Sequence, residues 1–415
     1  MTARAGMPAG WFPPDSSPAP LARIPSGPLA ADSAVRLAIL RSPHIRAALA
    51  EVGIAAADLW QASTFPNPVL DALYAFPASG IAVSSANVGF SVVRALQVPL
   101  RRRVAAAELT STELRIADVV LRVAVDAQRA YVTVQHAQQV VELRRTAASA
   151  AEVAATAAKA LRAAGNVPAL RLASEEAAAA ESVVGVMDAE GELLGARAEL
   201  ARLMAADVPD SGWTVPARLA DPDAADWTLA IIDSLALARR LDIGAARESA
   251  RAAAATLGLS TSFRFLADGT IGATFEREPD GRFAGPSASV PLPLFDRGGA
   301  GVARAAAVLR QRVAMHDALV VNVHAEVRTR LAQVRNASQR ARQLRTVVLP
   351  LRERVLAEAQ RHVNAMDLTI FALLQAKEAE IEAGRAYLDA LRDYWIGRAE
   401  LERAAGGALP GGHTR

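Results

Sequence analysis

The chain has 415 residues, of which 52% are hydrophobic but only 5% aromatic, and its net charge is +3. A charge this small, with 46 basic and 43 acidic side chains, gives no basis for a nucleic-acid partner. The absence of cysteine excludes disulfides, thiolate catalysis, cysteine metal sites and a lipid anchor on an N-terminal cysteine of this chain. Alanine makes up for the missing aromatic residues, and such a composition favours closely packed helices.

The N-terminal segment, residues 1–30, is rich in Pro, Gly and Ser, and we expect it to be disordered. It contains no apolar core of the kind found in signal peptides. No segment of the chain approaches the roughly 18 consecutive apolar residues of a membrane-spanning helix. Because the features described below are typical of an exported protein, we expect the natural reading frame to extend upstream of Met1 and to encode a signal sequence.

The rest of the chain contains an internal repeat with a constant spacing. Leu37–Ala48 matches Leu235–Ala246 in its Leu, Ala, Arg and Ile residues and in its final pair of alanines. The same spacing pairs Leu96 with Leu294, Val104 with Val302, Asn166 with Asn364 and Leu170 with Leu368. The sequence therefore predicts two copies of one structural unit. We divide the chain into a disordered segment at 1–30, a first copy at 31–205, a linker at 206–228, a second copy at 229–404 and a flexible tail at 405–415.

Each copy begins with a predicted helix, at about 31–61 and 229–257, followed by strand-like alternation of apolar and polar residues. In the first copy this alternation covers Asn87–Val98. In the second copy it appears around Phe263–Phe265 and again around Ile271–Phe275. Such alternation over about 9–11 residues is what a membrane β-barrel strand requires. A soluble hairpin with an exposed edge fits these strands, taken alone, nearly as well.

Very long helical segments follow the strands. Residues 100–162 contain no glycine or proline, and residues 298–363, which begin with Gly298, contain within them only Gly299, Gly301 and Pro350. At about 1.5 Å per residue, each segment would extend roughly 95–100 Å, so the helices must pack along one another as coiled coils. Pro350 is expected to kink its helix. Breaks at 165–168 and 364–367, followed by return helices at 169–204 and 368–403, predict two antiparallel helical hairpins per chain.

Several motifs resemble the TolC-like outer-membrane factor (outer membrane efflux protein) family. Gly285–Gly299 is similar to the junction between strand and helix in that family's second repeat, and Thr64–Leu70 to the beginning of its first strand. Val347–Pro350, together with Asp367-Leu368 before the helix that carries Tyr387–Ala390, resembles its second hairpin. The resemblance covers about residues 37–403. Two departures concern glycine, which is absent from the first junction, Leu96–Arg103, and from the second break, where Asn364-Ala365 stands.

The resemblance implies a mainly α fold with a small β part. Two repeated units of long antiparallel α-helical hairpins would carry β-strands that complete a transmembrane β-barrel only in a trimer. It further implies an outer-membrane channel with a periplasmic extension, in a tripartite efflux system, that passively conducts substrate exported by an inner-membrane pump. The implied partners are two further copies of the chain, a periplasmic adaptor protein, the pump and outer-membrane lipid. Neither enzymatic activity nor a cofactor is expected. The junction at 285–299 weakly favours the heavy-metal efflux branch.

The two breaks between helices are the predicted functional sites, because they would form the periplasmic mouth, dock the adaptor and gate the channel. Asn166 and Asn364 are expected to supply left-handed backbone there. Asp367 is the only carboxylate at a break. It would appear three times around the mouth of a trimer and could favour cations, or it could cap the return helix. The predicted docking and gate residues are Gly165, Asn166, Val167, Pro168, Asn364, Ala365, Met366 and Asp367.

Other motifs support simpler interpretations. The six histidines have no metal-ligand spacing, and Gly298–Gly301 lacks the Lys-Ser/Thr of a phosphate-binding loop, so we expect a turn there. A basic stretch on a long helix is expected to be a solvated face paired with neighbouring acids; it comprises Arg328, Arg330, Arg335, Arg340, Arg342 and Arg345. The main alternative function is a soluble coiled-coil adaptor or scaffold without channel activity. Strands at equivalent places in both copies argue against it, and no catalytic constellation indicates an enzyme.

Overall fold

The computed structural model describes residues 27–75, 83–206, 212–223, 227–265, 269–278 and 281–409. Most of the predicted disordered N-terminus, parts of the predicted linker and most of the predicted tail lie outside these ranges. The chain divides into two compact units. Unit 1 comprises Met1–Arg46, Val119–Arg240 and Val323–Arg415, and unit 2 comprises Ala47–Asp118 and Leu241–Asn322. Each unit therefore combines parts of both sequence copies, whose boundaries remain a prediction.

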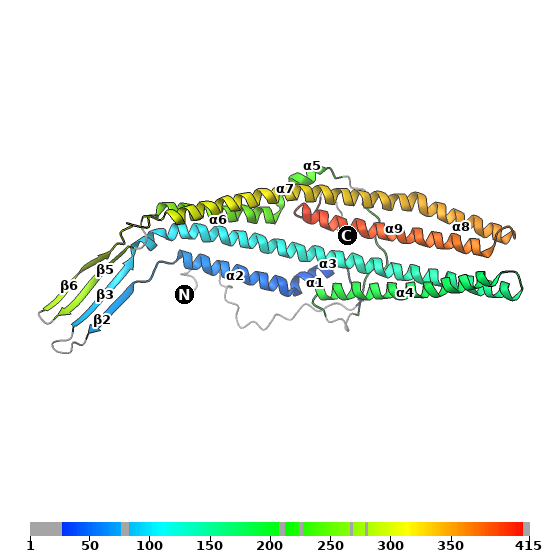
Figure 1. Ribbon diagram of the computed structural model, residues 1–415, viewed down its shortest axis with the longest axis horizontal. Coiled ribbons are helices and arrows are strands. Elements are labelled where there is room, and N and C mark those ends of the chain that lie inside the picture. The colour runs from blue at the N-terminus through cyan, green and yellow to red at the C-terminus, as the bar shows by residue number, and fades with distance from the viewer. Residues whose placement is uncertain are drawn as a thin grey trace. The chain divides into compact units, whose positions relative to one another are not determined.

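Unit 2 contains a four-stranded antiparallel sheet in the order β2-β3-β5-β6 (Figure 1). The strands are β2 (Val69–Ala75), β3 (Val83–Ser91), β5 (Thr270–Glu278) and β6 (Gly281–Ser289). Consecutive strands from the two copies thus form one sheet, with β2 and β3 from the first copy and β5 and β6 from the second.

Two strand predictions need correction. The predicted strand at 87–98 ends at Ser91, because the Ser91 hydroxyl accepts a hydrogen bond from the Arg94 N–H and caps a helix that begins at Val92. The alternation around Phe263–Phe265 does not form a strand, since the preceding helix continues to Ser262 and a turn follows. Apolar runs this short do not distinguish a strand from a helix end.

The helices of unit 2 are α2 (Pro43–Ser63, from residue 47), the beginning of α3 (Val92–Ala163), α6 (Leu241–Ser262) and the beginning of α7 (Gly299–Gln343). The Ser111 hydroxyl on α3 donates a 2.8 Å hydrogen bond to the Ala245 carbonyl on α6. A Cβ on Gly244 would lie 3.2 Å from Leu114 Cδ1, so α3 and α6 approach closely at this glycine.

The predicted single helix at the start of each copy is two helices. Helix α1 (Ala31–Arg41) is separated from α2 by Ser42, and α5 (Leu229–Arg239) from α6 by Arg240. Pro43 has no N–H to continue the first helix, and the Ser42 hydroxyl accepts from the Ile45 N–H at 3.3 Å, which starts the next. The starts of α1 and α5, and those of α2 and α6, keep the constant spacing of the sequence repeat.

Unit 1 contains the two predicted antiparallel hairpins. The first is the remainder of α3 with α4 (Ala169–Leu203), and the second joins the remainder of α7 and α8 (Leu349–Asn364) to α9 (Ile370–Ala404). Side by side, the helices run in the order α4, α3, α9, α8 (Figure 1). Arg145 on α3 pairs with Glu190 on α4 at 2.5 Å, and His136 on α3 with Asp389 on α9 at 2.7 Å.

A π-helical turn, η3 (Leu344–Val348), connects α7 to α8 at the site of the predicted proline kink. The Leu349 N–H donates to the Leu344 carbonyl, which closes a wider turn than that of an α-helix. Pro350, which has no N–H, stands in the first turn of α8, where that donor is not needed. The wider turn thus accommodates the proline within a continuous helical path.

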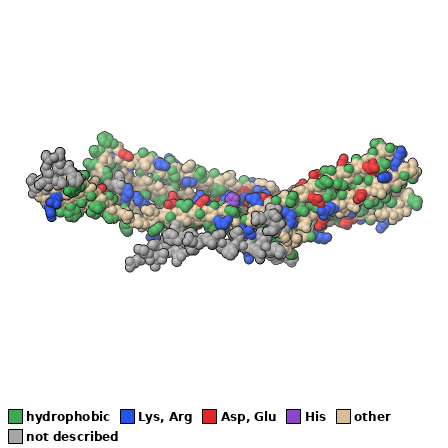
Figure 2. Space-filling view, turned by 90° about the horizontal axis from the view of Figure 1, so that it is seen from below, with side chains coloured by type: hydrophobic (Ala, Val, Ile, Leu, Met, Phe, Trp, Pro, Cys, Tyr) green, Lys and Arg blue, Asp and Glu red, His purple; other side chains and the backbone are tan. Residues whose placement is uncertain are grey.

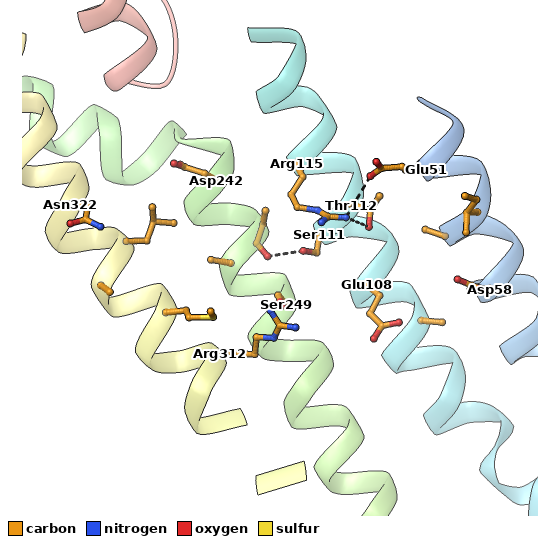
Figure 3. Close-up of a pocket in the computed structure, with 18 residues that line it drawn as sticks. Glu51, Asp58, Glu108, Ser111, Thr112, Arg115, Asp242, Ser249, Arg312 and Asn322 are labelled. Carbon is orange, nitrogen blue, oxygen red and sulfur yellow. Dashed lines mark hydrogen bonds and ion pairs between the residues drawn. The ribbon is translucent and has the colours of Figure 1, made fainter. Parts of the chain in front are cut away.

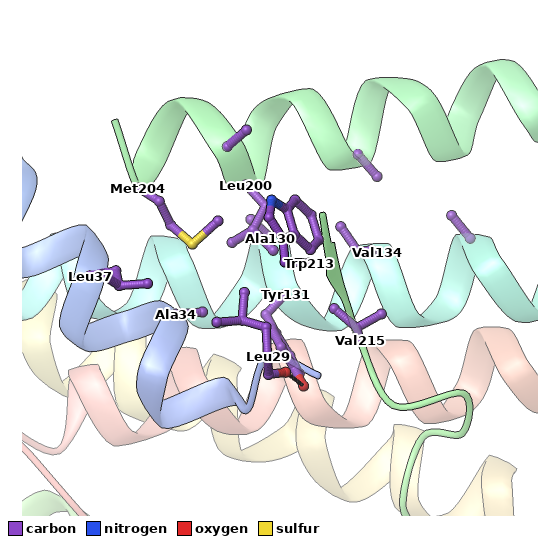
Figure 4. Close-up of a cluster of buried hydrophobic side chains, with 13 residues drawn as sticks. Leu29, Ala34, Leu37, Ala130, Tyr131, Val134, Leu200, Met204, Trp213 and Val215 are labelled. Carbon is purple, nitrogen blue, oxygen red and sulfur yellow. Dashed lines mark hydrogen bonds between the residues drawn. The ribbon is translucent and has the colours of Figure 1, made fainter. Parts of the chain in front are cut away.

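A buried cluster of unit 1 lies where α1, α3 and α4 meet a two-residue parallel ladder between β1 (Gly27–Pro28) and β4 (Trp213–Thr214) (Figure 4). Trp213 and Leu29 are fully buried there. The Tyr131 hydroxyl donates a 2.8 Å bond to the Leu29 carbonyl, and burial raises the pKa of Tyr131 to about 12. Trp227 occupies the position equivalent to Leu29 in the second copy, and its carbonyl likewise accepts from a long helix, through Arg335.

None of the helices in the described ranges carries an apolar stretch sufficient to span a lipid bilayer.

Candidate functional site

One face of the sheet in unit 2 is apolar. Strand register places Leu70, Val88, Ala273 and Pro286 side by side in one row. The next row toward the β2–β3 connection is apolar too, and hydrophobic side chains are visible over the sheet, at the left of Figure 2. We call this surface the apolar sheet face; it comprises Leu70, Ala72, Ala86, Val88, Phe90, Ile271, Ala273, Phe275, Ala284, Pro286 and Ala288.

The opposite face of the same sheet is mostly polar or made of glycine. We call it the polar sheet face; it comprises Asp71, Ser85, Asn87, Gly89, Ser91, Thr270, Gly272, Thr274, Glu276, Gly285, Ser287 and Ser289, with Val69, Leu73, Ala75 and Phe283 as apolar exceptions. The Ser287 hydroxyl donates to Asn87 Oδ1 at 3.2 Å, across the intervening strand β5. A Cβ on Gly272, which lies on β5, would be 3.0 Å from that hydroxyl oxygen and 2.3 Å from the Val88 carbonyl oxygen.

The sheet therefore separates an apolar surface from a water-compatible one. Strands β3, β5 and β6 each have nine residues, close to the roughly 9–11 of a membrane-crossing strand. At the strand ends beyond the apolar sheet face lies a polar row of Tyr74, Ser84, Arg277 and Arg282. Strands β2 and β6 are the edges of the described sheet, each paired on one side only.

The first predicted site, at the break between α3 and α4, is a tight turn with a left-handed glycine. The Asn166 N–H donates to the Leu161 carbonyl at 2.8 Å, and the Gly165 N–H donates to the Arg162 carbonyl at 3.0 Å. This pair of bonds is the Schellman motif, which requires a positive φ at the residue after the helix cap. Gly165 supplies it, with φ of 77°.

The second predicted site has the same turn built on a methionine. The Asp367 N–H donates to the His362 carbonyl at 2.9 Å, and the Met366 N–H donates to the Val363 carbonyl at 3.0 Å. Met366 has φ of 60° and its side chain is 95% exposed. The expected left-handed roles of Asn166 and Asn364 are therefore wrong. Along the sequence, the two turns lie farther apart than the other matching positions of the two copies. The constant spacing of the repeat therefore pairs Asn166 with Asn364, although Asn364 is the last residue of α8.

Asp367 does not cap the return helix. The cap of α9 is Thr369, whose side chain accepts from the Ala372 N–H at 3.4 Å. The Asp367 carboxylate instead lies 3.3 Å from His362 Nδ1 and is largely exposed. The Thr369 cap was missed, although a threonine directly before an apolar helix start is a recognised signal.

The two turns lie together in unit 1, so the eight predicted residues form two adjacent sets. The Arg171 guanidinium on α4 stands 4.1 Å above the ring of Phe371 on α9, one turn or less into each return helix. This cation–π contact fixes the ends of the hairpins at the same level. No pattern in the sequence marks Arg171 and Phe371 as partners.

Several histidines and part of the basic stretch contact acidic side chains. His136 and Asp389 link the two hairpins, and burial together with the nearby Arg392 guanidinium lowers the pKa of His136. Within the described ranges, no group of His, Cys, Asp and Glu side chains is arranged to hold a metal ion. In the basic stretch, Arg330 pairs with Glu400, Arg340 with Asp393 and Arg345 with Asp221, so the predicted pairing with neighbouring acids is confirmed for these three.

Unit 2 also has an open groove of about 900 Å³ across α2, α3, α6 and α7 (Figure 3). Carboxylates from three helices face it, and Arg115 lies 4.0 Å from Glu51 and bonds to the Thr112 hydroxyl at 3.2 Å. The groove also has apolar lining, including Ile54, Met315 and Leu319, and it is open. It is therefore a mixed surface groove and not an enclosed ligand pocket. Its labelled polar residues are Glu51, Asp58, Glu108, Ser111, Thr112, Arg115, Asp242, Ser249, Arg312 and Asn322.

Comparison with known proteins gives a match of structure alone. No protein-family model matches the sequence, and no curated protein matches it. Among solved structures, the chain is similar to CusC, described by its transmembrane channel formation (TM-score 0.77, 16% identity, 91% of this chain and 92% of that one). It is also similar to the Campylobacter jejuni outer membrane channel CmeC (0.77, 15%, 91% and 85%) and to the Neisseria gonorrhoeae outer membrane channel MtrE in its open state (0.75, 17%, 91% and 89%). The chain has the fold of these outer-membrane channels.

This channel fold confirms the predicted fold class and, at the level of fold, the resemblance to TolC-like outer-membrane factors. The mainly α chain carries two long helical hairpins, and its small β part combines strands from both copies. Since 91% of this chain is covered, the match concerns the chain as a whole and not one segment of it.

Proposed function

We propose that this chain is the outer-membrane channel component of a tripartite efflux system. It would passively conduct substrate, delivered by an inner-membrane pump, across the periplasm and outer membrane. The observation that carries this proposal is the division of the sheet into an apolar and a polar face. An exposed apolar face of eleven side chains needs an apolar neighbour, and a bilayer supplies one over the length of nine-residue strands.

The same sheet explains why a single subunit cannot form a barrel in the membrane. Open strand edges leave backbone N–H and C=O groups without partners, which costs several kcal/mol per group in hydrocarbon. Edge strands β2 and β6 run antiparallel to each other in the four-strand order. Strand β6 of one subunit can therefore pair with β2 of the next subunit. We infer a homotrimer with a twelve-stranded barrel, the polar sheet face lining an aqueous bore.

The turns around Gly165 and Met366 are proposed as the periplasmic mouth that docks an adaptor protein and gates the bore. They are exposed, they contribute few buried contacts, and the Arg171–Phe371 contact holds them level. Replacing Val167-Pro168 or Ala365-Met366 by charged residues should therefore abolish efflux while the trimer survives. Loss of the trimer with loss of efflux would assign these residues a structural role instead.

The test of the barrel is a matched pair of substitutions on neighbouring residues of β3. Ala86 lies on the apolar sheet face and Ser85 on the polar one. Ala86→Arg should cost about 2–4 kcal/mol of insertion into lipid, whereas Ser85→Arg should be tolerated and should alter conductance. With an export signal supplied, the two proteins are compared for trimer in outer-membrane extracts and for conductance in planar bilayers.

Equal behaviour of the two variants would overturn the barrel proposal. So would a wild-type protein that remains a water-soluble monomer with full helix content, because the exposed apolar face would then have no membrane to contact. That outcome would favour the soluble coiled-coil adaptor or scaffold.

A further inference from the structure

Two arginines stand directly opposite each other at one end of the sheet in unit 2. Strand register pairs Arg277 on β5 with Arg282 on β6. Both side chains are exposed, and within the described ranges neither has an ion-pair partner. Side chains opposite each other on antiparallel strands have Cβ atoms about 4.5–5.5 Å apart, and like charges at such a pair are destabilising. An anion that contacts both guanidinium groups would remove this repulsion.

The neighbouring Glu276 does not supply that anion. Successive residues of a strand point to opposite faces of the sheet, so Glu276 lies on the polar sheet face, between Ser85 and Phe283. On the side of the arginines, the adjacent row of the apolar sheet face has no charged side chain; it consists of Ala72, Ala86, Phe275 and Ala284. The described part of the sheet thus provides no anion on the face where the two arginines stand.

The arginine pair marks one boundary of the apolar sheet face. On β5, Arg277 follows Ile271 by six positions, which is roughly 20 Å along a strand. This length approaches the apolar band of about 25 Å on membrane barrels. The row at the other boundary is apolar, with Phe90, Ile271 and Ala288 side by side. Among the described rows of this face, basic charge is therefore confined to the end farther from the long helices.

The proposed outer-membrane location determines which leaflet this end of the sheet meets. The helical hairpins would extend into the periplasm, so the strand ends farther from them would meet the outer leaflet. That leaflet consists mainly of lipopolysaccharide, whose lipid A anchor carries phosphates on its sugars, directly beside the acyl chains. A guanidinium binds a phosphate through two parallel N–H···O bonds, and the aliphatic stem of an arginine can lie along apolar surface.

We propose that Arg277 and Arg282 together bind a phosphate of lipid A, while the acyl chains of the same molecule lie on the apolar sheet face. The hydroxyl of Ser84, in the same row, can donate a hydrogen bond to the phosphate or to its sugar. Each subunit would carry one such pair on the lipid side of the barrel. This inference rests on the proposed outer-membrane channel and assigns a lipid partner to its surface.

Lipid binding can be measured on the full-length trimer in detergent, produced with an export signal supplied. The probe is lipid A, used either with its phosphates or after their removal. The wild type should bind the phosphorylated form at least about tenfold more tightly, because the charge-assisted contacts require the phosphate. Arg277→Gln with Arg282→Gln should bind both forms alike. A preference that persists in this variant would overturn the assignment.

Arg352→Gln with Arg354→Gln is the matched control. These two arginines lie on α8 and are exposed as well, so their replacement removes the same charge from the chain. The control should keep the wild-type preference for the phosphorylated form. An equal loss in the control would show that the net charge of the chain attracts the lipid, and the arginine pair would then not be a site.

Inorganic phosphate distinguishes a lipid site from a site for a free anion. At millimolar concentration it should leave the lipid bound, since it has no acyl chains to cover the apolar sheet face. Complete displacement would assign the arginine pair to a soluble anion and would contradict the lipid proposal.

Two further measurements separate this inference from the channel proposal. Circular dichroism should show native helix content in every variant, so that lost binding is not mistaken for lost folding. A wild-type trimer that conducts, yet binds both forms of lipid A equally, would overturn the lipid site and leave the channel proposal intact. A wild-type chain that forms no trimer would instead defeat the channel proposal.

Discussion

The two turns that end the helical hairpins have the same backbone but different residues. At the first, Gly165 takes the positive φ of the Schellman motif, and at the second Met366 takes it. The hydrogen bonds are equivalent, since the Asn166 N–H donates to the Leu161 carbonyl and the Asp367 N–H to the His362 carbonyl. The backbone requirement was therefore retained between the copies, while the residue best suited to it was retained in only one.

The routes from sheet to long helix differ more than the turns do. Helix α3 begins at Val92, directly after β3, whereas a further segment separates β6 from α7. That additional segment ends at Gly298, with φ of 69°, and its neighbour Asp296 accepts the Gly298 N–H at 2.8 Å. The first copy needs no glycine at this point because its chain makes no turn. This difference explains the missing glycine in the first junction.

The largest expected effect comes from replacing Gly298 by a residue with a side chain. A Cβ there would lie 2.5 Å from the Arg264 carbonyl oxygen, and the backbone is left-handed as well. Gly298→Val should lower the free energy of unfolding by on the order of 3 kcal/mol. Thermal melts of helix content measure the change.

Gly299→Val is the control for this effect. Gly299 begins α7, and a Cβ there meets open space within 4 Å. A loss of stability as large as that of Gly298→Val would mean that the junction does not depend on the left-handed turn.

The next effect is a pair of opposite changes at the hairpin turns. Gly165→Ala forces a side chain into left-handed backbone and should cost about 1 kcal/mol, whereas Met366→Gly relieves the same strain and should gain a similar amount. Neither change meets a steric obstacle in the structure, because a Cβ on Gly165 has nothing within 4 Å and Met366 is almost fully exposed. Unfolding in denaturant measures both, and changes of the same sign would refute the equivalence of the turns.

The sequence predicted the hairpins and the sheet better than their boundaries. Long segments with few glycines and prolines, ended by Gly165 and by Asn364–Asp367, placed both hairpins close to their observed positions. The repeat spacing was reliable where α1 and α5 begin, but it failed at the turns, because the second copy has a longer path between strand and turn. An ungapped alignment carries no information about such insertions.

The turns between the helices were predicted in place, but the contacts around them were not. Thr369, not Asp367, caps α9, and Arg171 contacts Phe371 across the hairpins. The docking and gating roles of the turn residues stay a prediction. The apolar sheet face could not be derived either, because alternation shows that a strand has two faces but not which residues of other strands share them. Only the register aligns Leu70 with Val88, Ala273 and Pro286.

A smaller effect depends on pH and concerns the contact between the two helical hairpins of one chain. His136 in the first copy and Asp389 in the second lie 2.7 Å apart, and burial and Arg392 lower the pKa of His136 below its ordinary 6.5. The unfolded chain therefore takes up a proton before the folded chain does. The stability that neutral His136 contributes is complete above pH 6.5 and is lost as pH falls below it.

His136→Gln isolates this contribution, because it removes the titrating group and keeps a polar side chain. At pH 8 the variant should be less stable by about 1 kcal/mol, the value of one hydrogen bond. The difference from wild type should shrink as pH falls from 7 to 5. A difference that stays constant across this range would mean that His136 does not couple the hairpins to pH.

The smallest effect separates the two turns by charge and rests on the proposed trimer. The first turn has no ionisable residue between Gly165 and Pro168, while the second presents the exposed Asp367 carboxylate beside His362. Asp367→Asn keeps the size of the side chain and, since Thr369 caps α9, should leave the helix unchanged. It removes three negative charges from the proposed mouth. Conductance in planar bilayers should change by less than about twofold at 0.1 M salt and more at 0.01 M, where the screening length grows from roughly 10 to 30 Å. Asn166→Asp adds a charge at the first turn and should shift cation preference in the opposite direction. Conductance that is indifferent to both changes at every salt concentration would place these turns away from the ion path.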